Sequence, residues 1–324
     1  DVDAGNQGVF AKGSTGASIN STGDVTTGAF GNDAIFAFSF AGPATVTSVG
    51  DVTSGNRGVT AITQNGAAMV NSTGVVLSDL QGVYAQSFIG DATVVQTGNV
   101  TSTNDSGVSA YSGQVNSSVT VDGDVSARLM GVVAHAFDGD AMVNADGMVT
   151  SSQDRGIVAS TTGTTGGNVS IQSSGGVNSS KAAINGLAAG LSGDVVINND
   201  GDLVSNHPSG DSIGILAFAN QGSVDVTHSG GIVATDWGIN AVALGSGNDA
   251  SVTSMADILQ SRQAISAFAL GGSASVDSTG DITSTKQGLF ALGGTGATVM
   301  SVGDITSTED DAIFAMANAG DVSV

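Results

Sequence analysis

Short apolar segments alternate with turns rich in glycine, aspartate and asparagine along the whole chain, and the pattern repeats about every 25 residues. The clearest example is Gly-Asp-Val-Thr-Thr at residues 23–27, which returns in variant form in each repeat. Its aliphatic position is occupied by Val25, Val52, Val76, Val100, Val125, Val149, Val177, Leu203, Ile232, Ile258, Ile282 and Ile305. A fixed period of this length indicates a solenoid or an array of repeats.

Two further aliphatic columns keep the same period. One belongs to a Gly-Val-x-Ala pattern and comprises Val9, Ile35, Val59, Val83, Val108, Val132, Ile157, Ile184, Ile215, Ile239, Ile265, Leu289 and Ile313. The other comprises Ile19, Val46, Val70, Val94, Val119, Val143, Ile171, Ile197, Val226, Val252, Val276, Val299 and Val324. Each aliphatic residue has a small residue two positions away, so both point to the same face of a strand. Three strands per repeat, separated by turn residues, predict one triangular coil.

A helical repeat would have a different composition. Glu309 is the only glutamate, leucine is scarce, and no apolar pattern runs at helical spacing. A propeller blade would need four strands and a longer repeat. The sequence therefore predicts an all-β fold, a single right-handed parallel β-helix of about 12–13 triangular coils of roughly 24–25 residues, continuous over residues 1–324 as one domain. At about 4.8 Å per coil, such a stack would form a rod roughly 60 Å long.

The residues that alternate with the Gly-Val-x-Ala anchors are expected to point outward. If Ile35 and Ala37 face the interior, Phe36 and Phe38 face solvent, and most other residues at these two outward positions are also apolar. A stripe of this kind is larger than a soluble monomer usually exposes, so we interpret it as a contact surface. The alternatives are an inverted alternation, with the aromatic residues inside, or loops that fold back over the face. The predicted interface residues are Phe10, Phe36, Phe38, Tyr84, Tyr111, Phe218, Phe268, Phe290, Phe314 and Met316.

Charged side chains are expected to gather in the corner that precedes this strand. Its basic residues are Arg57, Arg128, Arg155, Lys181, Arg262 and Lys286, and acidic residues share the corner. Pairing between adjacent coils is expected for Asp236 with Arg262 and for Lys286 with Asp310. Exposed pairs of this kind contribute well under about 1 kcal/mol each.

The repeated Gly-Asp pairs raise the question of calcium. Asp257, Asp281 and Asp304 would stack on successive coils, where a cation would relieve the repulsion between their carboxylates. However, the nonapeptide pattern of calcium-binding β-rolls is absent, and Val75, Met148 and Gly231 interrupt the column. The preferred interpretation is that each aspartate caps its own turn. Calcium is thus the one cofactor left open, and no metal site is predicted.

No convincing catalytic site is found. Residues 210–214 match Gly-x-Ser-x-Gly, with His207 and His228 nearby, but a hydrolase elbow must follow a strand and open a helix. Polysaccharide-cleaving β-helices need clustered carboxylates with a basic residue, and Asp310 and Asp311 lack such a partner in their own coil. We therefore predict no catalytic and no cofactor-binding residues, with a carbohydrate-active β-helix enzyme as the alternative.

Composition narrows the range of partners. The net charge of −22 disfavours binding to nucleic acid or anionic membranes. Because the sequence contains no run of 18 apolar residues, we predict no membrane-inserted helix. The absence of cysteine excludes disulfides and thiolate metal sites. Because the sequence starts at Asp1 and both ends fall inside a repeat, we expect a segment of a longer, processed polypeptide.

The succession Gly-Asp-Ile-Thr-Ser-Thr, Gly-Leu-Phe-Ala, Gly-Ala-Thr-Val and again Gly-Asp-Ile over residues 280–305 resembles the β-helical passenger repeats of Gram-negative autotransporters and related secreted adhesins. The likeness covers essentially the whole chain. It implies export through the outer membrane and display outside the cell. We therefore expect a non-enzymatic structural or adhesive rod that associates with copies of itself, laterally or end to end, or with a host or cell-surface ligand. The alternative within this class is a calcium-dependent adhesin.

Overall fold

The computed structural model describes residues 1–28, 32–207 and 212–324. These residues form 39 strands and no helix. Residues 1–158 make up unit 1 and residues 159–324 make up unit 2. The boundary falls inside strand β20 (Ile157–Thr161).

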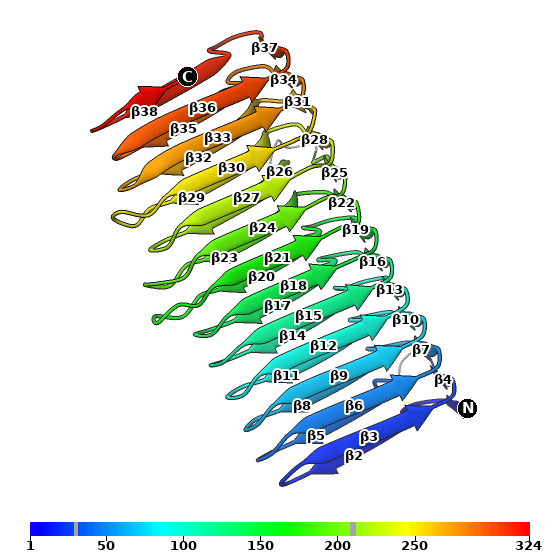
Figure 1. Cartoon of the computed structure of the whole chain (residues 1–324). Coiled ribbons are helices and arrows are strands. Elements are labelled where there is room, and N and C mark those ends of the chain that lie inside the picture. The colour runs from blue at the N-terminus through cyan, green and yellow to red at the C-terminus, as the bar shows by residue number, and fades with distance from the viewer. Residues whose placement is uncertain (29–31, 208–211) are drawn as a thin grey trace. The chain divides into compact units, whose positions relative to one another are not determined.

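Unit 1 contains three parallel sheets, named here A, B and C, and each coil contributes one strand to each sheet (Figure 1). Sheet A contains β1 (Val2–Ala4), β4 (Val25–Thr27), β7 (Val52–Ser54), β10 (Val76–Ser78), β13 (Val100–Ser102), β16 (Val125–Ala127) and β19 (Val149–Ser151). Sheet B contains β2 (Val9–Gly13), β5 (Ile35–Ser39), β8 (Val59–Thr63), β11 (Val83–Ser87), β14 (Val108–Ser112) and β17 (Val132–Ala136). Sheet C contains β3 (Ala17–Thr22), β6 (Ala44–Val49), β9 (Ala68–Thr73), β12 (Ala92–Thr97), β15 (Ser117–Asp122) and β18 (Ala141–Ala145).

Unit 2 repeats the same three-sheet arrangement. Its sheet A contains β22 (Val177–Ser179), β25 (Leu203–Ser205), β28 (Ile232–Ala234), β31 (Ile258–Ser261), β34 (Ile282–Ser284) and β37 (Ile305–Ser307). Its sheet B contains β23 (Ala182–Ala188), β26 (Ile213–Ala219), β29 (Trp237–Ala243), β32 (Gln263–Ala269), β35 (Leu289–Gly293) and β38 (Ile313–Ala317). Its sheet C contains β21 (Val169–Ser173), β24 (Val195–Asn199), β27 (Val224–His228), β30 (Ala250–Ser254), β33 (Ser273–Thr279), β36 (Gly296–Val302) and β39 (Val322–Ser323).

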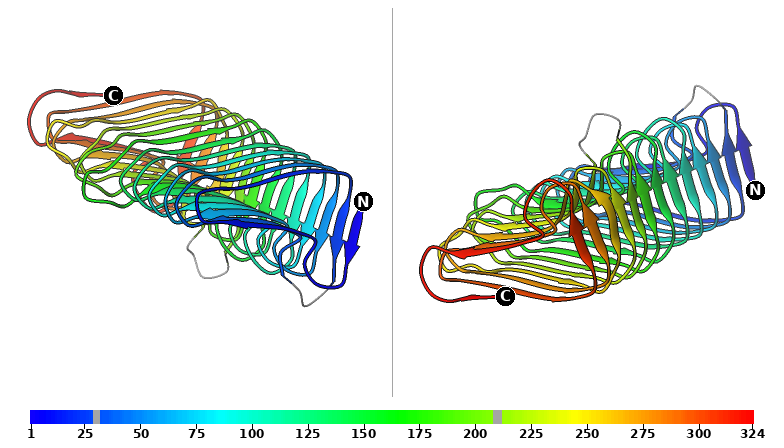
Figure 2. Two further views of the ribbon diagram at one scale, coloured as in Figure 1. Left: turned by 90° about the horizontal axis from the view of Figure 1, so that it is seen from below. Right: turned by 90° about the horizontal axis from the view of Figure 1, so that it is seen from above.

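Within each unit, a strand pairs in parallel with the equivalent strands of the neighbouring coils. The register aligns the predicted anchors, as where Val76 lies opposite both Val52 and Val100. In unit 2, Ile232 lies opposite Leu203 in the same way. Each coil winds around a closed interior (Figure 2). The predicted all-β class and three-stranded parallel coil are confirmed, and the coils counted along the chain number about 13.

The interior of each unit is a set of stacked aliphatic side chains. Val52, Val83 and Val94, one from each predicted column, are 0% exposed, and the small residues two positions away also face inward. Side chains between them point out, as the two-residue period of a strand requires. Burial of the narrow core of each unit provides the main favourable free energy for its fold.

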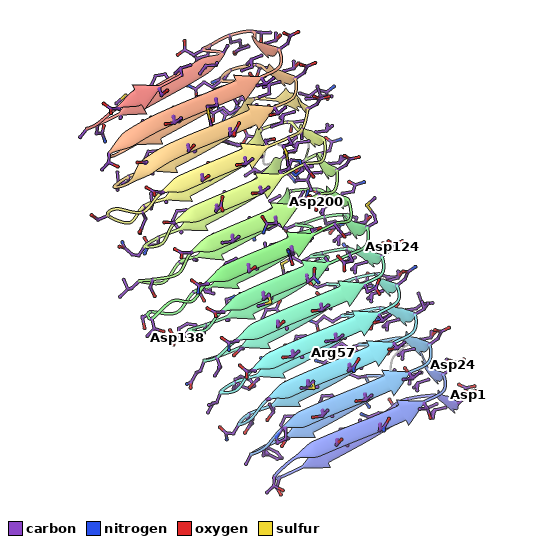
Figure 3. All side chains as sticks on the ribbon, in the orientation of Figure 1. Asp1, Asp24, Arg57, Asp124, Asp138 and Asp200 are labelled. Carbon is purple, nitrogen blue, oxygen red and sulfur yellow. The ribbon has the colours of Figure 1, made fainter. Side chains whose placement is uncertain are left out.

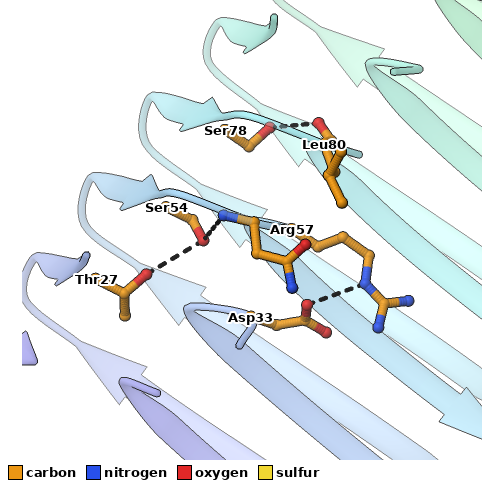
Figure 4. A network of polar contacts seen from close by, with 7 residues as sticks. Thr27, Asp33, Ser54, Arg57, Ser78 and Leu80 are labelled. Carbon is orange, nitrogen blue, oxygen red and sulfur yellow. Dashed lines mark hydrogen bonds and ion pairs between the residues drawn. The ribbon is translucent and has the colours of Figure 1, made fainter. Parts of the chain in front are cut away.

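Small hydroxyl side chains form hydrogen bonds with backbone and side-chain groups at the corners between sheets A and B. In the second and third coils of unit 1, Thr27 Oγ1 donates a hydrogen bond to Ser54 Oγ at 3.2 Å, and Ser54 Oγ accepts one from the backbone N–H of Asn56 at 3.1 Å (Figure 4). One coil further on, Ser78 Oγ donates to the carbonyl of Leu80 at 2.9 Å. In these coils the serine or threonine that ends the repeated motif therefore supplies hydrogen bonds to groups that are buried or partly buried at the corner.

The glycine of the Gly-Val-x-Ala pattern lies where the backbone turns into sheet B. A Cβ on Gly82 would lie 2.3 Å from Val100 Cγ1 and 2.6 Å from the carbonyl oxygen of Gly107. Both distances are far shorter than van der Waals contact, and the carbonyl belongs to backbone that is held in the sheet. At Gly82 the corner packs directly on the next coil and leaves no room for a side chain, whereas Ala34, Ala183, Ala264 and Ala312 occupy the equivalent position on other coils.

We expect Gly82→Ala to lower the free energy of unfolding by about 1–3 kcal/mol, since the added methyl group overlaps a backbone carbonyl of the next coil unless the two coils shift apart. Thermal and urea unfolding followed by circular dichroism measure the loss. Gly5→Ala is the matched control, because a Cβ on Gly5 meets nothing within 4 Å. Equal unfolding midpoints for the two variants would contradict the packing described.

Candidate functional site

The predicted interface residues of unit 1 lie on the outer face of sheet B. Phe10 lies opposite Phe36 in one outward column, which also contains Tyr84. Phe38 and Tyr111 occupy the second outward column, two residues further along their strands. The alternation is therefore as predicted, with aromatic side chains outside and aliphatic anchors inside.

The interface residues of unit 2 occupy the same two outward columns of its own sheet B. Phe290 lies opposite Phe314 in the first column. Phe218 and Phe268 lie in the second column with Val242 between them, and Met316 lies opposite Leu292 further along.

Most of these outward side chains are only partly exposed to solvent. Phe10 is 49% exposed and Met316 is 43% exposed, but Tyr84 is only 8% exposed. The other members, Phe36, Phe38, Tyr111, Phe218, Phe268, Phe290 and Phe314, are half-buried. The spacing of the coils brings rings within contact distance, with centroids 5.6 Å apart for Phe10 and Phe36 and 5.2 Å apart for the stacked Phe290 and Phe314. Neighbouring rings therefore cover one another.

Cationic side chains also cover the rings of unit 1. The guanidinium carbon of Arg57 lies 5.8 Å from the ring centroids of both Phe36 and Tyr84. The ammonium of Lys12 lies 5.8 Å from the Phe38 ring. Each cation–π contact contributes about 0.5–1 kcal/mol at an exposed site. The face thus combines aromatic surface with a small number of positive charges.

Arg57 is held in place by an acidic side chain from the preceding coil. Arg57 Nε donates a hydrogen bond to Asp33 Oδ1 at 3.0 Å, and the side chain of Asp33 is only 3% exposed (Figure 4). Burial raises the pKa of Asp33, and the charge of Arg57 opposes that rise. The sequence placed Arg57 in this corner but did not pair it with Asp33. Their separation of 24 residues, which equals one coil, was a usable signal.

The corner of unit 2 contains one of the two pairs expected from the sequence. Arg262 Nε donates to Asp236 Oδ1 at 2.6 Å, with the arginine side chain 42% exposed. Arg262 also lies 5.8 Å from the ring centroid of Trp237. Among the described residues, Lys286 forms no ion pair with Asp310.

The titratable groups on the outer face of sheet B in unit 1 are mostly uncharged near neutral pH. Tyr84 Oη donates to Gln86 Oε1 at 2.9 Å, and burial raises the pKa of Tyr84 to about 12. Burial also raises the pKa of Tyr111 and lowers the pKa of His135, whose ring lies 6.0 Å from that of Tyr111. Contacts with this face therefore depend on aromatic surface and hydrogen bonds more than on ionisation.

The repeated Gly-Asp corner forms a ladder between coils. Asp24 Oδ1 accepts a hydrogen bond from the backbone N–H of Asp51 at 2.9 Å, and Asp51 Oδ1 accepts one from Val75 at 2.9 Å. Asp124 Oδ1 accepts from Met148 at 2.9 Å, and Asp24 and Asp124 lie along the same edge of unit 1 (Figure 3). The interpretation that each aspartate caps its own turn is wrong, because parallel stacking brings the next coil's N–H to the carboxylate.

The same ladder runs through the three aspartates that suggested calcium. Asp257 Oδ1 accepts from the backbone N–H of Asp281 at 2.8 Å, and Asp281 Oδ1 accepts from that of Asp304 at 3.0 Å. Among the described residues, no cluster of three or more histidine, cysteine, aspartate or glutamate side chains has the arrangement to hold a metal ion.

We expect Asp51→Ala to lower the free energy of unfolding by about 1 kcal/mol, because the N–H of Val75 loses its acceptor at an exposed corner. Asp51→Asn keeps an acceptor oxygen and should retain most of the stability. Denaturant unfolding of the two variants measures the difference. If Asp51→Ala and Asp51→Asn lose the same free energy of unfolding, the charge of Asp51 stabilises the fold and its hydrogen bond does not.

The Gly-x-Ser-x-Gly segment does not assemble a hydrolase site in the described residues. Gly210 and Asp211 lie outside those residues, and the buried Ser212 Oγ accepts a hydrogen bond from the backbone N–H of His207 at 2.6 Å. His228 ends strand β27 of sheet C, whereas Ser212 precedes strand β26 of sheet B. Asp310 and Asp311 are exposed.

His228 faces the interior of unit 2 rather than solvent. It is 0% exposed, and its Nδ1 lies 2.9 Å from Asn199 Nδ2, so Nδ1 is the acceptor and the ring is neutral. Burial lowers the pKa of His228 to about 4. Sequence reasoning missed this interior position, although the alternation along β27 places it on the same face as Val224 and Val226.

The buried imidazole makes unit 2 sensitive to acid. An unfolded histidine titrates near pH 6.5 and the folded one near 4, so the unfolded state binds more protons between these values and stability falls as pH falls through that window. The loss should reach about 3 kcal/mol at its full extent.

His228→Ser places at this position the residue found on the next two coils, Ser254 and Ser278. Urea unfolding at about pH 7 and about pH 4.5 should show a smaller acid-induced loss in the variant than in the wild type. Parallel losses in both proteins would contradict the assignment of the effect to His228.

The chain matches no protein-family model, and no curated protein or solved structure shows significant similarity to it. Among the described residues, there is no helix with the length and apolar character needed to cross a membrane.

Proposed function

We propose that this chain is a non-enzymatic structural or adhesive β-solenoid that acts outside the cell, with the outer face of sheet B as its contact surface. The observation that carries the proposal is the pair of outward columns on that face, which present aromatic and aliphatic side chains on successive coils of each unit. Apolar surface arranged continuously is typical of sites that bind other macromolecules.

The other outward positions are more polar. The outer residues of sheet A in unit 1 include Thr26, Thr53, Thr101 and Thr150. Sheet C exposes mainly serine, threonine and asparagine, with isolated methionines such as Met69. Sheets A and C also expose aliphatic residues, such as Leu77 at 45% and Val49 at 48%, but their described strands carry no aromatic side chain at an outward position. The aromatic content of the sheet B face supports its assignment as the contact surface.

The buried ionisable groups serve the scaffold. Asp33 pairs with Arg57 and His228 pairs with Asn199, so each is engaged in holding neighbouring coils together. This use of titratable groups favours a structural role over a catalytic one.

The partner that the surface suits best is a second copy of the chain or a cell-surface ligand. Copies of a chain with a charge of −22 repel one another, but acidic residues are absent from the outward positions of sheet B, and they lie mainly in the corners. Added salt screens that repulsion while leaving aromatic contacts intact, so self-association should strengthen as ionic strength rises.

Replacing Phe36, Phe38, Phe268 and Phe290 together by Ser should abolish this association, because the change removes four of the large aromatic side chains of the face, two from each unit. Sedimentation velocity across a range of protein and salt concentrations measures the oligomers, and circular dichroism confirms that the variant is folded. The matched control replaces Met69, Met142 and Met300 by Ser, since these residues are 45%, 50% and 54% exposed on sheet C. Unchanged assembly of the phenylalanine variant, or a wild-type chain that stays monomeric throughout, would overturn self-association through sheet B.

A further inference from the structure

A surface cavity of about 280 Å³ lies beside the first aromatic pair of unit 1. Its lining consists of Gln7, Phe10, Asn32, Asp33, Phe36, Asn56 and Arg57. Two phenylalanine rings and five planar polar side chains thus border one small space. A few convergent polar groups beside an aromatic wall are the usual composition of a small-molecule binding site.

The polar side chains carry the functional groups that bind paired hydroxyls. The amides of Asn32, Asn56 and Gln7 each contain donors and an acceptor in one plane, which suits neighbouring hydroxyls of a sugar ring. Asn32 Nδ2 donates one hydrogen bond to Asn6 Oδ1 at 3.3 Å, and an amide nitrogen has a second N–H. Arg57 gives its Nε–H to Asp33, and a guanidinium has further N–H donors besides that one. The contact with Asp33 positions Arg57 without removing its capacity to donate.

The aromatic side chains supply the complementary apolar wall. Phe10 is 49% exposed, and its ring is tilted by 32° relative to that of Phe36, with centroids 5.6 Å apart. The C–H-bearing face of a pyranose can pack on such a ring while its hydroxyls reach the amides.

Size and charge define the ligand further. The cavity is slightly smaller than the ~300–1,000 Å³ typical of pockets for drug-sized ligands, so it accommodates about one sugar ring. Its one carboxylate and one guanidinium neutralise each other, and the chain as a whole carries a charge of −22. These charges favour an uncharged ligand over an anionic one.

We propose that this cavity binds a single neutral pyranose unit of a glycan, with Phe10 and Phe36 as the apolar platform and Asn32, Asn56 and Arg57 as hydrogen-bonding groups. The inference rests on the proposed adhesive function, because it names a ligand class for part of the same face. Asp33 is a positioning residue, since it acts through Arg57.

Saturation-transfer difference NMR with the methyl glycosides of glucose, galactose, mannose and N-acetylglucosamine tests the proposal. At least one glycoside should receive saturation from the wild-type chain, as expected for an affinity in the mM range. The signal should disappear in Phe10→Ala and in Asn56→Ala. Both substitutions are made at residues with substantial or partial exposure, so the variants should fold.

Phe88→Ala is the control, since Phe88 is an exposed phenylalanine of unit 1, 52% exposed, that lies outside both this cavity and the outward columns of sheet B. It should bind the glycoside as the wild type does. Saturation transfer that is absent for every glycoside, or equal in all variants, would overturn the proposal. A stronger signal for methyl glucuronide than for methyl glucoside would overturn the assignment of a neutral ligand.

Sedimentation velocity of the same variants without sugar measures their assembly, so sugar binding and self-association are tested independently. Loss of sugar binding in Phe10→Ala with assembly retained supports a distinct sugar site on the contact face. Assembly of the wild type with no sugar binding would reject the site and leave the contact surface standing.

Discussion

Parallel backbone pairing between consecutive coils is the constraint on which this structure depends. Because each strand pairs in register with its equivalents, every side chain stacks on the side chain at the same position one coil away. Such stacking is favourable for aliphatic, aromatic and hydroxyl groups, but it places like charges side by side. Only 11% of the residues are charged, and many of the acids lie at corners, where the Asp24 and Asp51 carboxylates accept hydrogen bonds from the next coil's backbone.

Stacking also explains some of the polar residues inside the units. At each corner the backbone leaves the sheet, and its carbonyl and N–H groups need other partners. Ser87 shows how the strand ends meet that need, since its Oγ donates to the carbonyl of Gly66 at 2.6 Å and accepts from the N–H of Gly90 at 2.7 Å. His228 and Asn199 take comparable positions in unit 2 with larger side chains, and for His228 the consequence of deep burial is a lowered pKa.

The same geometry gives the outer faces their character. Rings at equivalent positions pack against one another, as Phe290 does on Phe314, and arginine from an adjacent corner can lie over them, as Arg57 does over Phe36 and Tyr84. A face built in this way is rich in aromatic and aliphatic side chains, with hydrogen-bonding groups along its border. These properties suit contact with another chain and, beside Asn56 and Arg57, contact with a sugar.

The amino-acid sequence by itself determined the class of fold, the three interior columns and the face on which Phe10, Phe36 and Phe290 lie, because strand alternation and turn chemistry are local properties. It did not determine the pairing of Asp33 with Arg57, the inter-coil ladder of Asp51, or the difference between Tyr84 at 8% exposure and Phe10 at 49%. Those features depend on which atoms of neighbouring coils come into contact. Residues about 24 positions apart meet there, as Asp33 and Arg57 do, and only the tertiary structure decides how their side chains are oriented.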